Sequence, residues 1–261
     1  MLTIRGPQLS DLHAQSLRRF EEDLVEHVRR HFTNHMRTLG EPQIRRVVAY
    51  ALERGRGHGF TSERNLCLYL SLMLMLGGHF DVDVRLPWAA QILAEPAVPT
   101  LRIDRLTNEA MDYLDRVAGA DDHDIDQALV SVRATLPVLL AEHHTLAGPW
   151  EMRGEVQLRR LFPRNFGALP TAALHGIIAA ARAGSDRHGV VAPRGAAVYL
   201  ACVAMLGSAF DSDPLLPWAA AALATDAGPE GADRAERLYV EAMAWIDRWL
   251  ARPAAEERAH G

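Results

Sequence analysis

The sequence predicts an all-α protein in which a module of roughly five helices occurs twice and packs with pseudo-two-fold symmetry. Residues 58–90 and 188–220 share 16 identical residues over 33 ungapped positions, which indicates a tandem duplication. Apolar residues recur at helical spacing along much of the chain, and no convincing period-2 strand pattern is present. Two such copies resemble an isologous dimer joined into one chain, which predicts a groove along the axis between them.

Composition and the repeat place three segments along the chain. The first helical repeat covers residues 1–118, an acidic linker (GADDHDID) covers residues 119–126, and the second helical repeat covers residues 127–261. With 261 residues, 49% of them hydrophobic, the chain is long enough to bury a large core.

The first repeat begins with an amphipathic helix over residues 9–38, where an apolar residue recurs every four positions from Phe20 to Met36. A second helix follows over about residues 42–55. Ser62 or Thr61, with Glu63, then caps a third helix that runs to Leu76 and is apolar nearly all round, which predicts a central position near the interface between the repeats.

A short fourth helix carries Pro87 in its first turn, where the missing N–H costs little, and a fifth amphipathic helix covers residues 103–117. In the second repeat the same plan predicts helices at about residues 194–206, 215–224 and 232–250. Its first helix is expected at residues 125–144, bent or weakened at Pro137.

Composition excludes several classes of protein. The net charge of −5 is mild and the signs are interspersed, so no nucleic-acid partner is expected. All 28 basic residues are Arg, which excludes Schiff-base and Walker-type lysines, and no cofactor is expected. High Ala, Gly, Pro and Arg usage is typical of a bacterial chain from a high-GC genome.

The chain also predicts a cytoplasmic location. Cys67 and Cys202 stand in apolar runs at non-equivalent positions of the repeats, so we expect buried reduced thiols. The N-terminal residues lack an apolar signal region, and the longest apolar stretch, residues 66–76, is too short to span a bilayer. No membrane insertion is expected.

The strongest local pattern is F-D-x-D-x-x-L-P-W-A-A, which occurs in both repeats as Asp81, Asp83 and Trp88 and as Asp211, Asp213 and Trp218. We expect the aspartates to accept hydrogen bonds from free N–H groups at a helix start and the Trp to anchor the short helix. The alternative is a divalent cation on the paired carboxylates, but the other ligands of a calcium loop are missing.

Two histidines, His58 and His188, recur at equivalent places and could pair with Asp81 and Asp211. An imidazole oriented by a carboxylate is half of a general-base arrangement, but no nucleophile accompanies it. A hydrogen bond that fixes the Gly-rich turn to the Asp turn is therefore the favoured interpretation, and no catalytic residue is assigned.

The first helix offers two candidate binding features. His27, His31 and His35 are spaced four apart, as metal-chelating imidazoles on one helix are, but the second repeat has Gln157, Leu161 and Asn165 there, so a duplicated metal site is excluded. Three arginines of this helix and two at the start of the next form a basic side suited to an acidic protein partner: Arg29, Arg30, Arg37, Arg45 and Arg46.

In its context L-G-x-x-F-D-x-D-x-x-L-P-W-A, the signature resembles a loosely defined bacterial group of helical proteins often encoded near type VI secretion spikes and polymorphic toxins. The resemblance covers about 60 residues of each repeat. It implies an accessory role, such as an effector adaptor, chaperone or immunity protein, and it carries over no catalytic residues.

The resulting hypothesis is a non-catalytic protein-binding module whose partner is a secreted toxin or a secretion component. One alternative is a metal-binding enzyme or sensor that uses the His-rich helix. Another is a small-ligand binder with a pocket between the repeats, lined by Tyr69, Tyr199, Met75, Met205, Trp88 and Trp218. The sequence leaves the oligomeric state open.

Overall fold

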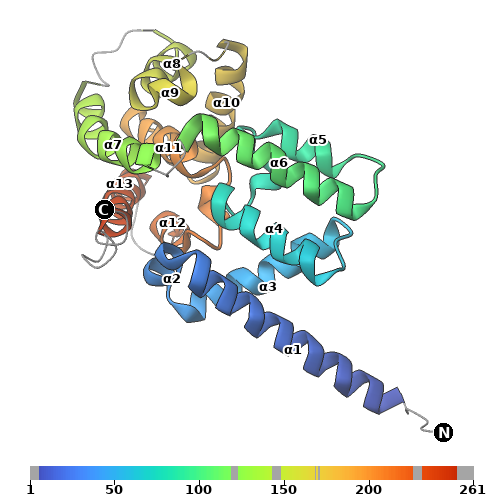
Figure 1. Ribbon diagram of the computed structural model, residues 1–261. Helices are drawn as coiled ribbons and strands as arrows, with labels where there is room; N and C mark the ends of the chain where they lie inside the picture. The colour runs from blue at the N-terminus through green and yellow to red at the C-terminus, as the bar shows by residue number, and fades with distance from the viewer. Residues whose placement is uncertain are drawn as a thin grey trace, which may run out of the picture.

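The computed structural model describes residues 6–118, 123–142, 148–167, 169, 171–225 and 231–251. Every regular element in these ranges is helical, which confirms the predicted all-α class (Figure 1). None of the described helices combines the length and apolar character that a membrane span requires.

Helices of the first half of the chain recur in the second half. The first repeat contains α1 (Gly6–His31), α2 (Thr33–Leu39), α3 (Glu41–Gly57), α4 (Glu63–Leu76), the 3-10 turn η1 (Phe80–Val82), α5 (Pro87–Leu93) and α6 (Pro99–Ala118). The second contains α8 (Trp150–Leu161), α9 (Pro163–Phe166), α10 (Thr171–Arg187), α11 (Pro193–Leu206), η2 (Phe210–Ser212), α12 (Pro217–Leu223) and α13 (Gly231–Leu250). The second half of α1 thus corresponds to α8, and each later element of the first repeat has its counterpart in order.

The predicted single helix over residues 9–38 is wrong, because α1 ends at His31 and α2 begins at Thr33. Phe32 leaves the helical region with φ −129° and ψ 53°. Phe162 makes the same break between α8 and α9, with φ −133° and ψ 66°. The apolar period of four continues across Phe32, so periodicity alone does not reveal the change of direction.

The helix expected at residues 125–144 is present as α7 (His123–Glu142), while residues 143–144 lie outside the described part of the chain. Its assignment as the first helix of the second repeat is wrong, because α7 packs against α6, α8, α11 and α13 and has no counterpart in the first repeat. Pro137 lies inside α7 without ending it. The helix includes residues 123–126 of the expected acidic linker, while residues 119–122 lie outside the described part of the chain.

Local sequence signals correctly predict the central helices. The Ser62 hydroxyl accepts a hydrogen bond from the Asn65 N–H (3.3 Å), which is the expected cap of α4. Pro87 and Pro217 occupy the first position of α5 and α12, as predicted. One continuous core contains the inner faces of α4 and α11, including Tyr69.

Both cysteines carry free thiols. Cys202 is buried and its pKa is raised to about 12 by desolvation, whereas Cys67 is only half-buried, so the prediction of two buried thiols holds for Cys202 alone.

Candidate functional site

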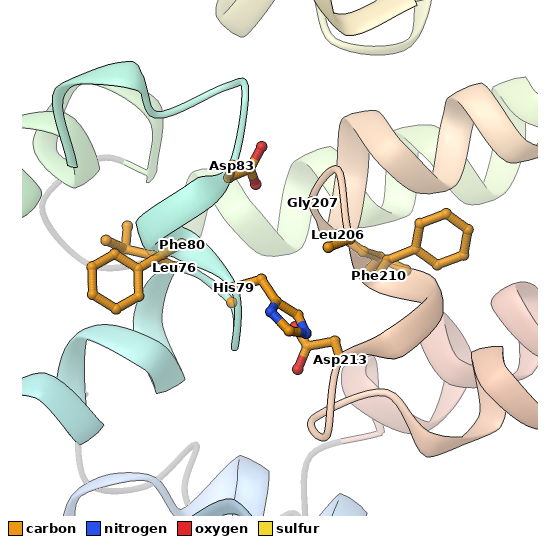
Figure 2. A pocket seen from close by; sticks show the side chains of 10 residues that line it. Leu76, His79, Phe80, Asp83, Leu206, Gly207, Phe210 and Asp213 are labelled. Carbon is orange, nitrogen blue, oxygen red and sulfur yellow. The ribbon is translucent and has the colours of Figure 1, made fainter. Parts of the chain in front are cut away.

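The two repeats meet where the turns that follow α4 and α11 face each other. We call this contact, made by residues 77–85 and 207–215, the seam (Figure 2). The side chains leave a space of about 160 Å³ there, and none of it is wide enough for a water molecule. The C-terminal ends of the two central helices thus lie at the interface, as predicted, but the expected groove is not open at this point.

On one side of the seam, Asp83 is held by Arg85. Its Oδ1 accepts the Arg85 N–H (2.9 Å), and its Oδ2 accepts from the guanidinium Nη2 (2.7 Å). The same guanidinium donates through Nη1 to the Ala204 carbonyl at the end of α11 (2.9 Å). Burial opposes ionisation of Asp83, but the charge and hydrogen bonds of Arg85 outweigh it and lower the pKa of this carboxyl.

On the other side, Asp213 lacks an equivalent arginine because Leu215 occupies that position. The carboxylate accepts the Leu215 N–H at Oδ1 (2.8 Å) and the Gly78 N–H of the first repeat at Oδ2 (2.8 Å). Burial raises the pKa of Asp213 despite these two backbone donors. A Cβ on Gly78 would overlap the Asp213 carboxylate, so a larger residue there would force this buried carboxylate to shift.

A histidine that occurs only in the first repeat adds a polar link across the seam. His79 Nε2 donates to the Ser212 carbonyl (3.3 Å), and its Nδ1 then accepts from the Tyr50 hydroxyl (3.1 Å) in the neutral tautomer. The corresponding residues of the second repeat are Ala180 and Ala209, so the link has no mirror image.

Away from the seam, each repeat contains a His–Asp–Tyr cluster. In the first, Asp81 Oδ2 accepts from His58 Nε2 (2.8 Å), the Tyr69 hydroxyl (3.0 Å) and Arg54 Nε (3.1 Å). Burial opposes ionisation, but the bonds from His58 and Arg54 outweigh it and lower the pKa of Asp81 to about 2. Asp81 Oδ1 is buried without a hydrogen-bond partner.

In the second repeat, Asp211 Oδ2 accepts from His188 Nε2 (2.7 Å) and the Tyr199 hydroxyl (2.8 Å). The pKa of Asp211 is also lowered, because these bonds outweigh burial. Gly184 stands in the place of Arg54, and the exposed Arg187 approaches at 3.4 Å instead.

The predicted His–Asp hydrogen bond is therefore confirmed in both repeats. The expected capping of a helix start is wrong for all four aspartates, because α5 and α12 have no side-chain cap. Asp83 and Asp213 accept the N–H two residues ahead, in the turn before these helices, and Asp81 and Asp211 accept from side chains. Because the carboxylate can only accept, His58 carries its proton on Nε2, and the cluster fixes the orientation of the imidazole.

Of the three histidines of the candidate metal site, His27 and His31 lie together on α1, with ring centroids 4.8 Å apart, and His27 also lies beside the Ser71 hydroxyl (3.1 Å). His35 lies on α2, with its ring 5.0 Å from that of Trp249, so the third histidine does not join the pair. Burial lowers the pKa of His35 to about 4. Within the described ranges, no three His, Cys, Asp or Glu side chains are grouped so that they could hold a metal ion.

Most of the candidate partner-binding arginines make contacts within the chain. Exposed ion pairs join Arg29 to Glu26 and Glu41, Arg30 to Glu26, and Arg45 to Glu22 and Glu41. Arg37 donates to the Trp249 carbonyl at the end of α13 (3.2 Å), and Arg46 is exposed. Glutamates of α1 and α3 thus match the charges of three of the five candidate arginines, Arg29, Arg30 and Arg45.

The residues expected to line a pocket between the repeats belong to, or pack against, the one continuous core. Tyr69 and Tyr199 are fully buried, Trp88 packs beside Tyr113 (6.3 Å between ring centroids), and none of the six lines the space at the seam. The structure does not bring these residues together.

The N-terminal half of α1 extends away from the other helices (Figure 1). The counterpart helix α8 begins at Trp150, which corresponds to Phe20, so residues 6–19 have no equivalent in the second repeat. Over residues 14–19, every side chain is exposed except the half-buried Leu17. Phe20 is the first described side chain of α1 that packs against the core.

Sequence reasoning missed the polar residues that only the first repeat contains. Arg54, His79 and Arg85 each contact the Asp clusters or the seam, and the second repeat has Gly, Ala and Leu in their places. A search for positions where the aligned repeats exchange a polar for a small or apolar residue would have found all three.

Comparisons of the chain with protein-family models, with curated proteins and with solved structures found no match.

Proposed function

We propose that the protein is a non-catalytic protein-binding module that presents the N-terminal half of α1 to a partner. The observation that carries this proposal is the extension of residues 6–19 beyond the body of the protein. The second repeat has the same core helices without this segment, so the module does not need it to fold.

A helical segment of this length is marginal in water when nothing packs against it. Leu17 and Phe20 give it an apolar side that continues into the core, and Leu9 and Leu12 precede them in the sequence. Such a helix gains stability when its apolar side enters a groove of another protein, with anchors at helical spacing. This arrangement suits a role in docking, and we call residues 6–19 of α1 the docking helix.

The partner class comes from the resemblance of the signature to proteins encoded near secretion spikes and polymorphic toxins. We propose a secreted toxin or a secretion component as the partner, with this chain as its adaptor, chaperone or immunity protein. Arg18 and Arg19 are exposed on the docking helix, which suits a groove with acidic residues at its rim.

The test is affinity capture from the cell that encodes the protein, with the tag at the C-terminus so that α1 stays free. Three forms are compared: the unchanged chain, Leu17→Glu, and Gln15→Glu as the matched control. Gln15 is exposed on the same helix, about 200° around the axis from Leu17, so it receives the same charge on the other side.

We expect one near-stoichiometric protein partner, retained by Gln15→Glu and bound at least about tenfold more weakly by Leu17→Glu in calorimetry with the purified partner. Equal affinity of the two variants for the partner would show that the apolar side of α1 does not bind it. Failure of the unchanged chain to retain any protein would overturn the proposed function itself.

A further inference from the structure

Helix α7 covers a face of the second repeat whose equivalent in the first repeat has no such cover. Of the four helices that α7 contacts, three belong to the second repeat, namely α8, α11 and α13 (Figure 1). Their counterparts in the first repeat are α1, α4 and α6, and within the described ranges no element of the first repeat corresponds to α7. The chain therefore presents the same three-helix face twice, once with a covering helix and once without it.

A methionine that occurs in both repeats shows the effect of this cover. Residues 109–111 of α6 and 241–243 of α13 both read Glu-Ala-Met. Met243 is only 7% exposed, and Asp247, one turn further along α13, pairs with Arg133 of α7 (2.7 Å). Met111 is 47% exposed. The same side chain at the same position is thus buried in the repeat that α7 covers and exposed in the other.

Six more positions on the three helices show the same difference in burial. We call the set of seven the uncovered face: Met111 and Leu114 on α6, Cys67, Leu68 and Ser71 on α4, and His27 and His31 on α1. Each is half-buried or exposed, whereas its counterpart is buried, in the same order Met243, Ile246, Ala197, Val198, Ala201, Gln157 and Leu161. Apolar side chains on all three helices are therefore available to a helix that would lie where α7 lies in the second repeat.

The charged contacts of α7 also have equivalents around the uncovered face. Arg133 of α7 pairs with Asp247 of α13, and Glu142 of α7 pairs with Arg160 of α8 (3.0 Å). In the first repeat the counterparts of Asp247 and Arg160 are the exposed Asp115 and Arg30. Arg30 pairs with Glu26, whereas Asp115 makes no ion pair or side-chain hydrogen bond within the described part of the chain.

From these equivalences we infer that the uncovered face binds an amphipathic helix built like α7 and supplied by another protein. The buried residues Leu129, Val132, Leu136 and Leu139 of α7 give the spacing of its apolar anchors. A basic residue at the place of Arg133 would face Asp115, and an acidic residue at the place of Glu142 would face Arg30. The uncovered face is thus a binding surface for a helix with this order of apolar and charged residues.

A second copy of the chain has no free helix with this pattern. Its own α7 is already seated on its second repeat. In the docking helix, Leu9 and Leu12 match the first two anchors of α7, but the third anchor falls on the polar Ser16. The inference therefore names a surface and an occupant beyond the proposed function, in which residues 6–19 do the binding.

The test uses a fluorescently labelled peptide of residues 123–142 with capped ends, added to the full-length protein. Fluorescence anisotropy should show saturable binding of one peptide per chain. Met111→Glu should weaken this binding at least about tenfold, because it places an unpaired charge under the peptide. Met152→Glu is the matched control, because Met152 is 55% exposed and lies on α8 of the covered repeat.

A charge reversal tests whether the bound peptide lies as α7 does. Arg133→Glu in the peptide should weaken binding to the unchanged protein at least about threefold, since it would face Asp115 with a like charge. Asp115→Arg in the protein should restore the affinity for this altered peptide. Leu17→Glu in the docking helix should leave the binding of the unaltered peptide unchanged, which separates this inference from the proposed function.

The absence of saturable binding up to about 1 mM peptide would overturn the inference. Equal weakening by Met111→Glu and Met152→Glu would place the peptide elsewhere and would overturn it as well, as would a failure of Asp115→Arg to restore binding. Light scattering tests the remaining occupant: a dimer of the unchanged protein that Met111→Glu dissociates would show that a second copy covers this face, against the inference. Binding lost only in Met111→Glu, with thermal unfolding equal to that of the control, supports it.

Discussion

Replacing Asp81 by Asn tests how much the His–Asp–Tyr cluster contributes to folding. The carboxylate side chain has no exposed surface and accepts from His58, Tyr69 and Arg54 through one oxygen. Asparagine keeps the shape but provides one neutral acceptor, so the charge of Arg54 loses its counter-ion in a partly buried place.

The expected cost follows from the bonds that are lost. A hydrogen bond to a charged group contributes about 1.5–3 kcal/mol, and a neutral bond about 1 kcal/mol. With one acceptor retained and the pairing to Arg54 lost, we expect the free energy of unfolding to fall by about 3 kcal/mol at pH 7. Urea unfolding followed by tryptophan fluorescence measures this value.

The second repeat supplies the matched control. Asp211 has the same His and Tyr partners, but Gly184 replaces Arg54, and Arg187 is exposed at 3.4 Å. Asp211→Asn should therefore cost about 1.5 kcal/mol, since an exposed arginine at this distance contributes little. The difference between the two variants measures the contribution of Arg54.

The dependence on pH gives a further check. The pKa of Asp81 is lowered from 3.8 to about 2, so its stabilising effect is complete above pH 3.8 and is lost as the pH falls toward 2. The gap between the unchanged chain and Asp81→Asn should be constant from pH 5 to 7 and shrink below pH 4. A cost below about 1 kcal/mol at pH 7, or a gap that grows in acid, would refute the reasoning.

The seam provides two other predictions. Gly78→Ala should cost about 2 kcal/mol in urea unfolding, because its Cβ overlaps the Asp213 carboxylate, whereas Ser208→Ala at the counterpart position should cost less than about 1 kcal/mol. Equal costs would contradict the close contact of the turns. Arg85→Leu leaves the buried Asp83 without its cation and should cost about 3 kcal/mol at pH 7. The pKa of Asp83 should then rise, so this variant should lose stability as the pH increases. A loss of unfolding free energy that is the same at every pH would contradict the role of Arg85 as the counter-ion of Asp83.

The local parts of the fold could be predicted from the sequence because their causes are local. A serine three residues ahead of a free N–H is enough to start α4, and a proline is compatible with the first turn of α5. The hydrogen bond between His58 and Asp81 could also be predicted from the sequence, because an equivalent His–Asp pair recurs in the second repeat.

The other parts of the fold depend on contacts between helices, which the sequence of a single helix does not specify. The apolar period runs through Phe32 as though one helix continued, although the chain bends there so that α2 reaches the end of α13. Some partners of the arginines were visible in the sequence, because Glu41 lies four residues before Arg45 on the same helix. The pair of Arg45 with Glu22 was hidden, since these residues come from two helices and only their packing brings them together.

The duplication makes each repeat a control for the other, and this decides where function should be sought. Leu215 completes the same turn as Arg85, so that turn does not require an arginine. By the same argument, α8 packs against α10 and α11 of the second repeat without the long extension that α1 carries in the first. In both copies the His and Asp residues of the signature make hydrogen bonds within the module. The extension formed by residues 6–19 occurs once and is not required by the module, so it is the surface on which binding of a partner should be tested first.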